Sequence, residues 1–545
     1  MQNFWYKNAI VYSLDVETFM DSDGDGVGDF PGLTQRLDYL SGLGITCLWL
    51  HPFYPSPNRD DGYDVMDYYS VDSRLGTLGD FVEFMHEAKK RGIGVMIDLV
   101  INHTSIQHPW FQAARSDKNS KYRDYYIWAD DPPETDPAEV IFPDAEDSIW
   151  EYDSKAGAYY LHHFYKEQPD LNISNPVVRD EIRKIVHFWL ELGVSGFRVD
   201  AVPYFVKNVE VLAKQYELES FLEDLREAVS ARNPEAVLLA EANVESEAFA
   251  TYFGDGNRMH MLFSFFANQK KFLALALQQS APLTEGLQQL PKTPRSCQWL
   301  NFVRHHDELT LDQLSEAERD KIYEAFAPEE QMQIYGRGIR RRLPPMFNGD
   351  RRRIELIYSL LFALPGIPLI RYGDEIGMGD DLSLPGRDSV RTPMQWSEKA
   401  NGGFSTAAPA CLSKPVISEG EYGYPNVNVT AQQREADSLL NWFDQVIRIR
   451  KQHPEIGWGN WKIIETDQPG VFAHCCAWKD KTVLTVHNLS EQACTVMLKS
   501  GSSGHLVDLF GDRAYPPSNT QSSQNPQLIS LEPYGYRWFR VEQKS

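Results

Sequence analysis

Short apolar segments alternate with amphipathic ones over roughly the first 380 residues of the chain. The apolar segments are continuous, which is typical of parallel strands that are covered on both faces. Residues 175–192 repeat apolar side chains at the helical period, and Asn175 is the predicted N-cap of that helix. The alternation predicts an α/β fold with a parallel sheet, either a barrel or a doubly wound sheet. The predicted strands are Ala9–Leu14, Thr46–His51, Val95–Ile101, Gly196–Ala201, Val237–Glu241, Leu300–His305 and Ile367–Tyr372.

Two segments interrupt this alternation, and a third replaces it. Residues 104–170 are rich in Asp, Pro, Tyr and Trp and lack a helical period, so they predict a domain inserted after the third strand. Residues 379–435 are rich in Gly, Pro, Ser and Asn and predict a second excursion. Short β-segments separated by turn residues predict a C-terminal antiparallel β-sandwich domain over residues 453–545. Residues 1–103 and 171–452 are left for the main domain.

The chain is strongly acidic, which restricts its partners. It has 545 residues, with 53 Lys and Arg against 77 Asp and Glu, for a net charge of −24. Such a charge repels phosphate backbones and anionic lipids, so neither nucleic acid nor membrane is an expected partner. The six cysteines lack a CxxC spacing and are expected to be buried thiols, which predicts a cytoplasmic location. A homo-oligomer is compatible with this composition.

Two further patterns bear on targeting and cofactors. The first ten residues show no signal-peptide pattern, and no apolar run approaches the ~20 residues of a membrane span. No GxGxxG follows a predicted strand, and no P-loop is present. We therefore expect no organic cofactor, and this pattern disfavours a nucleotide-dependent glycosyltransferase.

Polar residues follow the predicted strands at their carboxyl ends. Asp200, Glu241 and Asp307 end three different strands, with Arg198 two residues before the first of them. If the sheet is a barrel, these ends converge on the face where catalysis is built. A carboxylate pair about 5–5.5 Å apart suits retaining glycoside hydrolysis, in which one acid attacks and the other protonates the leaving oxygen. Any single carboxylate at a rim could equally form a structural ion pair, but three together favour catalysis.

The neighbourhoods of two carboxylates predict different roles for them. Arg198 and Asp200 point the same way from one strand, and the cation favours an ionised Asp200. Glu241 follows the apolar run Val237–Ala240, which is expected to raise its pKa and keep it protonated. Asp200 is therefore the predicted nucleophile, Glu241 the predicted acid/base, and Asp307 a stabiliser of the positive charge that develops on the sugar.

These segments resemble the α-amylase family of glycoside hydrolases, family 13, and within it are most similar to trehalose synthases. The matching segments span the whole main domain in the family's order: GDGVGDFPGLTQRLDYL, LWLHPFYPSPNRDDGYDV, IDLVINHTS, QPDLN, GFRVDAVPY, LLAEAN, HHDELT, YGDEIGMGD and RTPMQW. The resemblance implies a (β/α)8 TIM barrel, and it implies the same roles for the three carboxylates. It also implies that the sugar whose bond is cut is held by Tyr63, Asp64, His103, Arg198, His306 and Arg391. Asp64 and Arg391 are suited to grip the hydroxyls of a terminal sugar by charge-assisted hydrogen bonds.

The loop DSDGDGVGD, residues 21–29, predicts a structural calcium site. Four aspartates alternate with small residues, so that their oxygens can converge on one ion, with the Val27 carbonyl as a further ligand. The aspartates are Asp21, Asp23, Asp25 and Asp29. A solvated acidic turn is the alternative interpretation. A second calcium site of some relatives is not expected, because Lys207 stands where they have a Glu beside the positions of Asn102 and Asp170.

The resemblance predicts a retaining enzyme that acts on small α-glucosides such as maltose through a covalent glucosyl-Asp intermediate. Isomerisation of maltose to trehalose is favoured, with hydrolysis by an α-glucosidase or transfer by a transglucosylase as alternatives. Two departures from trehalose synthases keep these alternatives open. His305 replaces an Asn before the His-Asp pair, and FVKNVEVLAKQYELESF replaces a polar loop that borders the leaving-sugar site. A non-catalytic sugar-binding protein is a remote alternative, because no catalytic carboxylate is missing.

Overall fold

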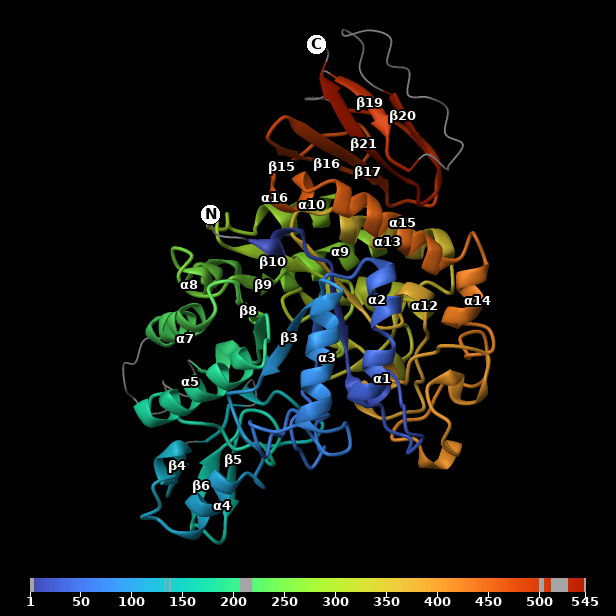
Figure 1. The fold of residues 1–545 in the computed structure, drawn as a ribbon. Coiled ribbons are helices and arrows are strands. Elements are labelled where there is room, and N and C mark those ends of the chain that lie inside the picture. Colours follow the sequence, from blue (N-terminus) through green and yellow to red (C-terminus); the bar gives the residue numbers. More distant parts are fainter. Residues whose placement is uncertain are drawn as a thin grey trace.

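The computed structural model describes residues 4–132, 134–136, 139–205, 218–498, 504–510 and 528–543. Within these residues, eight parallel strands close into a barrel in the order β1-β14-β10-β9-β8-β7-β3-β2 (Figure 1). The strands are β1 (Val11–Leu14), β2 (Cys47–Leu50), β3 (Gly94–Leu99), β7 (Gly196–Val199), β8 (Val237–Ala240), β9 (Met261–Phe263), β10 (Gln298–Asn301) and β14 (Ile367–Arg371). The predicted (β/α)8 barrel is confirmed, and the doubly wound alternative is excluded.

One barrel strand was not predicted from the sequence. Strand β9 has only three residues, Met261–Phe263, and runs into the apolar helix α9 (Phe265–Leu277). A short apolar run beside an apolar helix has no period that distinguishes strand from helix. Its identity as a strand is decided by pairing, because β9 hydrogen-bonds to both β8 and β10.

Helices cover the outside of the barrel, and local capping signals fix several of their ends. Helix α5 (Pro176–Glu191) begins after Asn175, whose side chain accepts a hydrogen bond from the Val177 amide, as predicted. Thr77 and Asp80 form a capping box at the start of α3 (Leu78–Lys90). Outside the two excursions, the described residues before the C-terminal domain also form α1 (Phe30–Gln35), α2 (Leu37–Leu43), α7 (Leu218–Arg232), α8 (Phe249–Phe253), α10 (Ala281–Gln288), α11 (Glu316–Phe326), α12 (Leu343–Met346), α13 (Arg351–Ala363), α15 (Leu439–Gln452) and α16 (Glu455–Trp458).

The two predicted excursions differ in structure. Between β3 and β7 the chain forms helix α4 (Pro109–Ser116) and a three-stranded antiparallel sheet of order β4-β6-β5. Its strands are β4 (Trp128–Ala129), β5 (Trp150–Asp153) and β6 (Ala158–Leu161). Residues 379–435 instead form turns, 3-10 segments such as η8 (Gly386–Val390) and the short helix α14 (Val429–Arg434). A further small sheet contains β11 (Leu309–Thr310), β12 (Gln333–Ile334) and β13 (Gly338–Ile339).

The C-terminal part is antiparallel, as predicted. One sheet has the order β15-β16-β17-β21-β19, and a second pairs β18 with β20. Leu484 and Val486 of the first sheet share a core with Val496 and Ile529 of the second, so the two sheets pack face to face. The strands are β15 (Asn460–Ile463), β16 (Val471–Trp478), β17 (Lys481–Asn488), β18 (Cys494–Met497), β19 (Gly504–Asp508), β20 (Leu528–Leu531) and β21 (Tyr536–Gln543). Figure 1 places these sheets and the β4-β6-β5 sheet at opposite ends of the molecule.

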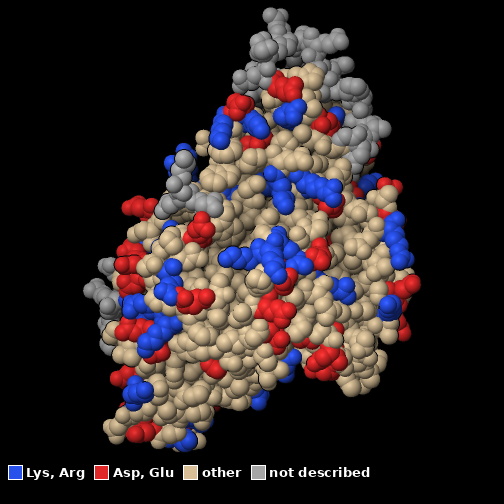
Figure 2. All heavy atoms as spheres, viewed as in Figure 1, with Lys and Arg blue, Asp and Glu red and all other residues tan. Residues whose placement is uncertain are grey.

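Surface charge and hydropathy add two observations. Acidic and basic side chains are interspersed over the face shown in Figure 2, so the excess of acid is not gathered there into one patch. Among the described residues, no helix combines the length and the apolar character that crossing a membrane requires.

Candidate active site

Two of the predicted catalytic carboxylates lie directly beyond neighbouring barrel strands. Asp200 follows β7, and its amide donates to the Leu99 carbonyl of β3 at 3.2 Å. Glu241 follows β8, and its amide donates to the Val199 carbonyl at 3.0 Å. The sheet ladder therefore extends to both residues and fixes their backbones at the carboxyl ends of the strands. Ala201, between them in space, has a left-handed φ of +52° and donates its amide to Glu241 Oε2 at 3.2 Å.

One guanidinium joins these two carboxylates to a third. Arg198 Nη1 lies 2.5 Å from Asp200 Oδ1 and 2.6 Å from Asp98 Oδ1, while Nη2 lies 2.8 Å from Glu241 Oε2. Asp98 is paired in register with Arg198 across β3 and β7 and is fully buried. The Arg198 charge therefore acts on both Asp200 and Glu241, so it does not by itself give the two groups different roles as the sequence argument assumed.

The pKa values of this pair depend mainly on burial. Burial raises the pKa of Asp200 to about 6, although Arg198 opposes the shift. Burial raises the pKa of Glu241 further, to about 7, and the neighbouring Asp200 and Asp307 charges add to the rise. Near neutral pH, Asp200 is thus the more easily ionised of the two, which suits a nucleophile beside a proton donor.

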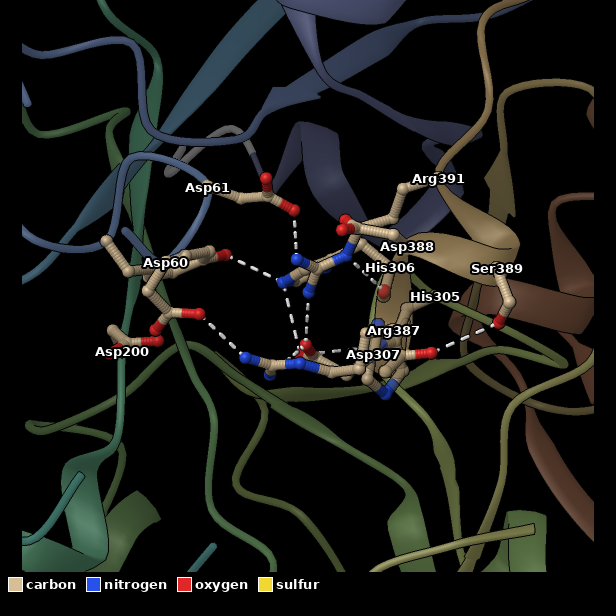
Figure 3. A network of polar contacts seen from close by, with 12 residues as sticks. Asp60, Asp61, Asp200, His305, His306, Asp307, Arg387, Asp388, Ser389 and Arg391 are labelled. Atoms are coloured by element: carbon tan, nitrogen blue, oxygen red, sulfur yellow. Dashed lines mark hydrogen bonds and ion pairs between the residues drawn. The ribbon is translucent and has the colours of Figure 1, made fainter. Parts of the chain in front are cut away.

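Asp307 is held by two arginines from the second excursion. Its Oδ1 lies 2.6 Å from Arg387 Nη1 and 2.8 Å from Arg391 Nη2 (Figure 3). Its Oδ2 lies 3.1 Å from His306 Nε2. Burial disfavours the charge, but the two guanidinium groups outweigh it and hold the pKa of Asp307 below its usual range. Asp307 is therefore ionised at the pH where Glu241 is largely protonated.

The carboxylate beside Arg391 is Asp61, and the structure does not bring Asp64 to that position. Arg391 Nη1 donates to Asp61 Oδ2, and the two side chains face each other in Figure 3. Asp64 is fully buried and accepts from Ser56 Oγ at 2.7 Å and from the Arg59 amide at 3.2 Å. Asp64 thus stabilises the loop, whereas Asp61 in the same DDGYD segment reaches the pocket. The structure therefore places Asp61, and not the predicted Asp64, beside Arg391, while the Asp64 oxygens are bonded within their own loop.

The remaining predicted substrate residues lie together. Tyr63 Oη is 2.8 Å from His306 Nε2, and the two rings are parallel within 5°. His103 Nε2 lies 3.2 Å from the Tyr63 carbonyl, and its ring packs against Phe164. His305, the departure noted in the sequence, accepts the Asp307 amide on Nδ1 at 3.1 Å. This bond fixes the turn that presents Asp307.

Four charged residues of the site were not predicted. Asp98 could have been suspected, because a carboxylate inside the apolar strand IDLVI needs a charged partner. Asp60 and Asp61 belong to the same segment, DDGYD, as the predicted substrate residues Tyr63 and Asp64. Sequence spacing does not show which of its three aspartates face the pocket. No sequence pattern indicates a role for Arg387. Its contact with Asp60, at 2.7 Å, joins two segments that are distant in sequence.

The site contains two cavities on either side of these ion pairs. A cavity of about 180 Å³ is lined by Glu241, Asp307 and Arg387 together with aromatic side chains that include Phe164 and Tyr204. A second cavity, of about 10 Å³, is lined by residues around Asp61, Tyr63, His306 and Arg391. The first can accommodate a small organic group, whereas the second has the space of about one water molecule.

The acidic loop 21–29 brings three of its four aspartates together. Asp21, Asp23 and Asp29 offer oxygen atoms that all lie within 4.8 Å of one another, which fits the hard oxygen ligands of calcium. Asp25 is exposed and is not in this cluster; its Oδ1 accepts the Val27 amide at 2.8 Å. The residues present therefore fit a cation, with Asp21, Asp23 and Asp29 as the carboxylates that can hold it.

Two other predictions concern the region of the suggested second calcium site. Asp170 is fully buried, and its oxygens lie 3.1 Å from Asn102 Nδ2 and 2.5 Å from His163 Nδ1. His162 and His163 are both buried in the same region. Lys207 lies outside the described residues, as does most of the FVKNVEVLAKQYELESF segment.

Comparisons with known proteins agree with this geometry. Residues 15–459 match the family model described as the alpha amylase catalytic domain, and residues 461–538 match that of the maltogenic amylase C-terminal domain. The trehalose synthase/amylase of Mycolicibacterium smegmatis is 41% identical over 558 residues, covering 99% of this chain and 93% of that protein. The trehalose synthase of Thermus thermophilus is 43% identical over 547 residues, covering 99% of this chain and 56% of that protein.

A solved structure has the same architecture over its full length. An inactive double mutant of a trehalulose synthase, an enzyme of Pseudomonas mesoacidophila, in complex with isomaltulose has a TM-score of 0.78 at 26% identity. The match covers 99% of this chain and 99% of that one. The α-amylase family model matches residues 15–459, which include every barrel strand except β1. This match confirms the family predicted from the sequence motifs. The chain therefore belongs to the α-amylase family of glycoside hydrolases.

Proposed function

We propose that this chain isomerises maltose to trehalose through a covalent glucosyl intermediate on Asp200. The observation that carries the proposal is the identity of 41% and 43% to two proteins named trehalose synthase, over 99% of this chain. The alignments to both proteins extend over the barrel and both excursions, and not over the catalytic motifs alone. A solved relative in complex with the disaccharide isomaltulose supports a small sugar as the substrate class.

The proposed reaction has two displacement steps. In the first, the Asp200 carboxylate attacks the anomeric carbon of the terminal glucose while Glu241 donates its proton to the bridging oxygen, so that glucose leaves. In the second, the released glucose turns, Glu241 removes the proton of its anomeric hydroxyl, and that oxygen attacks the anomeric carbon of the glucosyl group while the Asp200 carboxylate leaves. Each step inverts the anomeric centre, so the α configuration is retained. The ionised Asp307 favours the positive charge that develops on the sugar ring in both steps.

The terminal sugar is proposed to bind between Asp200 and the pair Asp61–Arg391. Asp61 takes the role that the sequence gave to Asp64, because Asp61 has its carboxylate beside the small cavity. Tyr63 and His306 line the same cavity, and Arg198 contacts Asp200 beside it. His103 contacts the Tyr63 carbonyl. A cavity with the space of one water is too small for a sugar ring, so the ion pairs must move apart when substrate binds.

The released glucose is proposed to remain in the larger cavity beside Glu241. Phe142, Phe164 and Tyr204 line this cavity, and aromatic rings suit the apolar face of a sugar. Arg387 joins Asp307 to Asp60 at the border of the cavity and can limit the entry of water while the glucose turns.

The product pattern tests the proposal directly. The protein is incubated separately with maltose, trehalose and sucrose, and the products are identified by NMR. Trehalose from maltose, and maltose from trehalose, are expected because an isomerase approaches equilibrium from both sides. Glucose as the only product would overturn the proposal and identify an α-glucosidase, and a new linkage from sucrose would identify a transglucosylase.

We also propose a structural calcium ion in the loop 21–29. The support is the cluster of Asp21, Asp23 and Asp29 oxygens; a bound ion would neutralise them and hold the loop together. The loop carries none of the catalytic carboxylates, so the ion would supply no chemistry to the reaction. Calorimetric titration with calcium is expected to show one site that is lost in Asp21→Asn and kept in Asp117→Asn, an exposed control. Equal binding by both variants would contradict the proposal.

We further propose a cytoplasmic location. The support is that all six cysteines are free thiols, a state that a reducing compartment maintains. Four of them are buried as expected, whereas Cys411 is exposed and Cys494 is half-buried. Fractionation of cells that express the native protein tests this, and recovery outside the cytoplasmic fraction would contradict it.

A further inference from the structure

Lys414, in the second excursion (residues 379–435), lies beside Asp61 and Arg391, the pair proposed to bind the terminal sugar. Lys414 is only 8% exposed. Its Nζ lies 2.8 Å from Asp61 Oδ1 and 3.1 Å from Asp388 Oδ1. Asp388 belongs to η8, the turn that also contains Arg387 and leads directly to Arg391. Lys414 therefore joins the loop of Asp61 to the turn whose arginines grip Asp307.

Asp61 is held from both sides by cations. Its Oδ1 accepts from Lys414, and its Oδ2 accepts from Arg391 Nη1. The Asp61 backbone has a left-handed φ of +46°, a conformation that is uncommon for a residue with a Cβ. A carboxylate with each oxygen bound to a different cation has a fixed plane, and a backbone in this region persists only when its surroundings hold it. Lys414 is one of the two cations that hold the Asp61 carboxylate in place.

The segment that carries Lys414 is itself anchored on the acidic loop 21–29. Ser405 Oγ donates to Asp21 Oδ2 at 2.6 Å, and the Ser413 amide donates to the Gly26 carbonyl at 3.0 Å. Gly26 has a φ of +101°, and a Cβ placed there would lie 2.1 Å from the Cys411 carbonyl oxygen. The backbones of the loop and of residues 411–413 thus pack against each other directly. This contact sets the position from which Lys414 reaches Asp61.

We propose that Lys414 is a positioning residue for the terminal sugar, which acts by holding Asp61 in the orientation that pairs with Arg391. The inference rests on the proposed function in that it takes Asp61 and Arg391 as the groups that bind this sugar. A purely structural ion pair would need only the contact of Lys414 with Asp388 on the same excursion. The contact with Asp61, from a loop 353 residues away in sequence, connects the lysine to the pocket.

Loss of the lysine should affect binding more than chemistry. Without Lys414, Asp61 keeps one cation and can rotate, so Arg391 is shared between Asp61 and Asp307 in a less defined geometry. Contacts to hydroxyls that do not react contribute to the ground state and the transition state alike, so their loss raises KM and leaves kcat largely unchanged. Asp200, Glu241 and Arg198 do not contact Lys414 and should be undisturbed.

The experiment compares Lys414→Met, Lys414→Arg and the control Lys399→Met in the full-length protein. Lys399 is an exposed lysine of the same excursion. We expect KM for maltose to rise about tenfold or more in Lys414→Met while kcat changes less than threefold, with partial recovery in Lys414→Arg and no change in Lys399→Met. The affinity for maltose in an Asp200→Asn background, measured by calorimetry, should fall by the same factor as KM rises.

Two results would overturn the inference. An unchanged KM and affinity in Lys414→Met would show that Asp61 does not need the lysine. An equal loss of kcat in both Lys414 variants, together with a lower melting temperature, would show a structural role only. If Lys414→Met does not fold, Lys414→Gln is judged by the same two criteria. The measurement follows maltose consumption whatever the product, so a failure of the isomerase proposal, seen in the wild-type products, is distinguishable from a failure of this one.

Discussion

The two sides of the catalytic pocket are built in different ways. On one side, Arg198 lies in β7, and Asp200 and Glu241 directly follow β7 and β8 with amides that extend the barrel ladder. On the other side, Asp307 is held by Arg387 and Arg391, which come from an excursion that consists of turns and 3-10 segments. The strand side has its geometry from the barrel. The loop side has its geometry from ion pairs between segments that are distant in sequence.

This difference suggests a division of labour. Groups on strands are rigid, which suits a nucleophile and an acid that must stay within a fraction of an ångström of the reacting bond. Groups on loops can separate and close again, which suits the binding of a sugar and the exclusion of water. Changes on the strand side should therefore abolish the reaction, and changes on the loop side should alter sugar binding or the products.

The largest effect is expected from Asp200→Asn, on the strand side. The amide cannot form the glucosyl intermediate, so kcat for maltose should fall on the order of 10⁴-fold or more. Steady-state kinetics measure this, with Asp117→Asn as an exposed aspartate control. Turnover within tenfold of the wild type would mean that another group is the nucleophile.

The pH dependence of kcat/KM for maltose should reflect the ionisation of Asp200 and Glu241. Asp200 must be ionised and Glu241 protonated, so kcat/KM should fall below about pH 6 and above about pH 7. Beyond these limits the loss approaches tenfold per pH unit, since one proton is gained or lost on each side. A profile measured for Glu241→Gln with α-glucosyl fluoride, whose leaving group needs no proton, should lose the alkaline fall. If the alkaline fall persists in that variant, the acid is a different residue.

Arg387→Met, on the loop side, is expected to have the smallest effect on the rate but to change the ratio of the products. The change removes the link between Asp307 and Asp60, while Asp307 keeps Arg391. Water should then reach the intermediate more often, so that the ratio of glucose to trehalose rises severalfold while maltose consumption changes less than tenfold. NMR of the products measures the ratio, with the exposed Arg352→Met as control. An unchanged ratio would mean that Arg387 does not exclude water.

The local features of the molecule could be predicted from the sequence, because each depends on a few neighbouring residues. The helix after Asn175 follows from a cap and a period, and the side chains of Arg198 and Asp200 share a face because strand side chains alternate. The polar ends of the apolar strands predict that Asp200, Glu241 and Asp307 stand at one rim of the sheet. Once the strands close into a barrel, their carboxyl ends lie together on one face of it.

The tertiary structure alone decided which distant groups pair. Strand β9 is a strand because it has two neighbours to bond, and not because of its three residues. Asp61, and not Asp64, meets Arg391 because the turn bonds the Asp64 carboxylate to its own loop and leaves the Asp61 carboxylate beside the arginine. The Asp61–Arg391 contact joins residues 330 positions apart, and no period or spacing within either segment encodes it. Local patterns determine which residues stand at the rim, and the packing of loops decides which of them face one another.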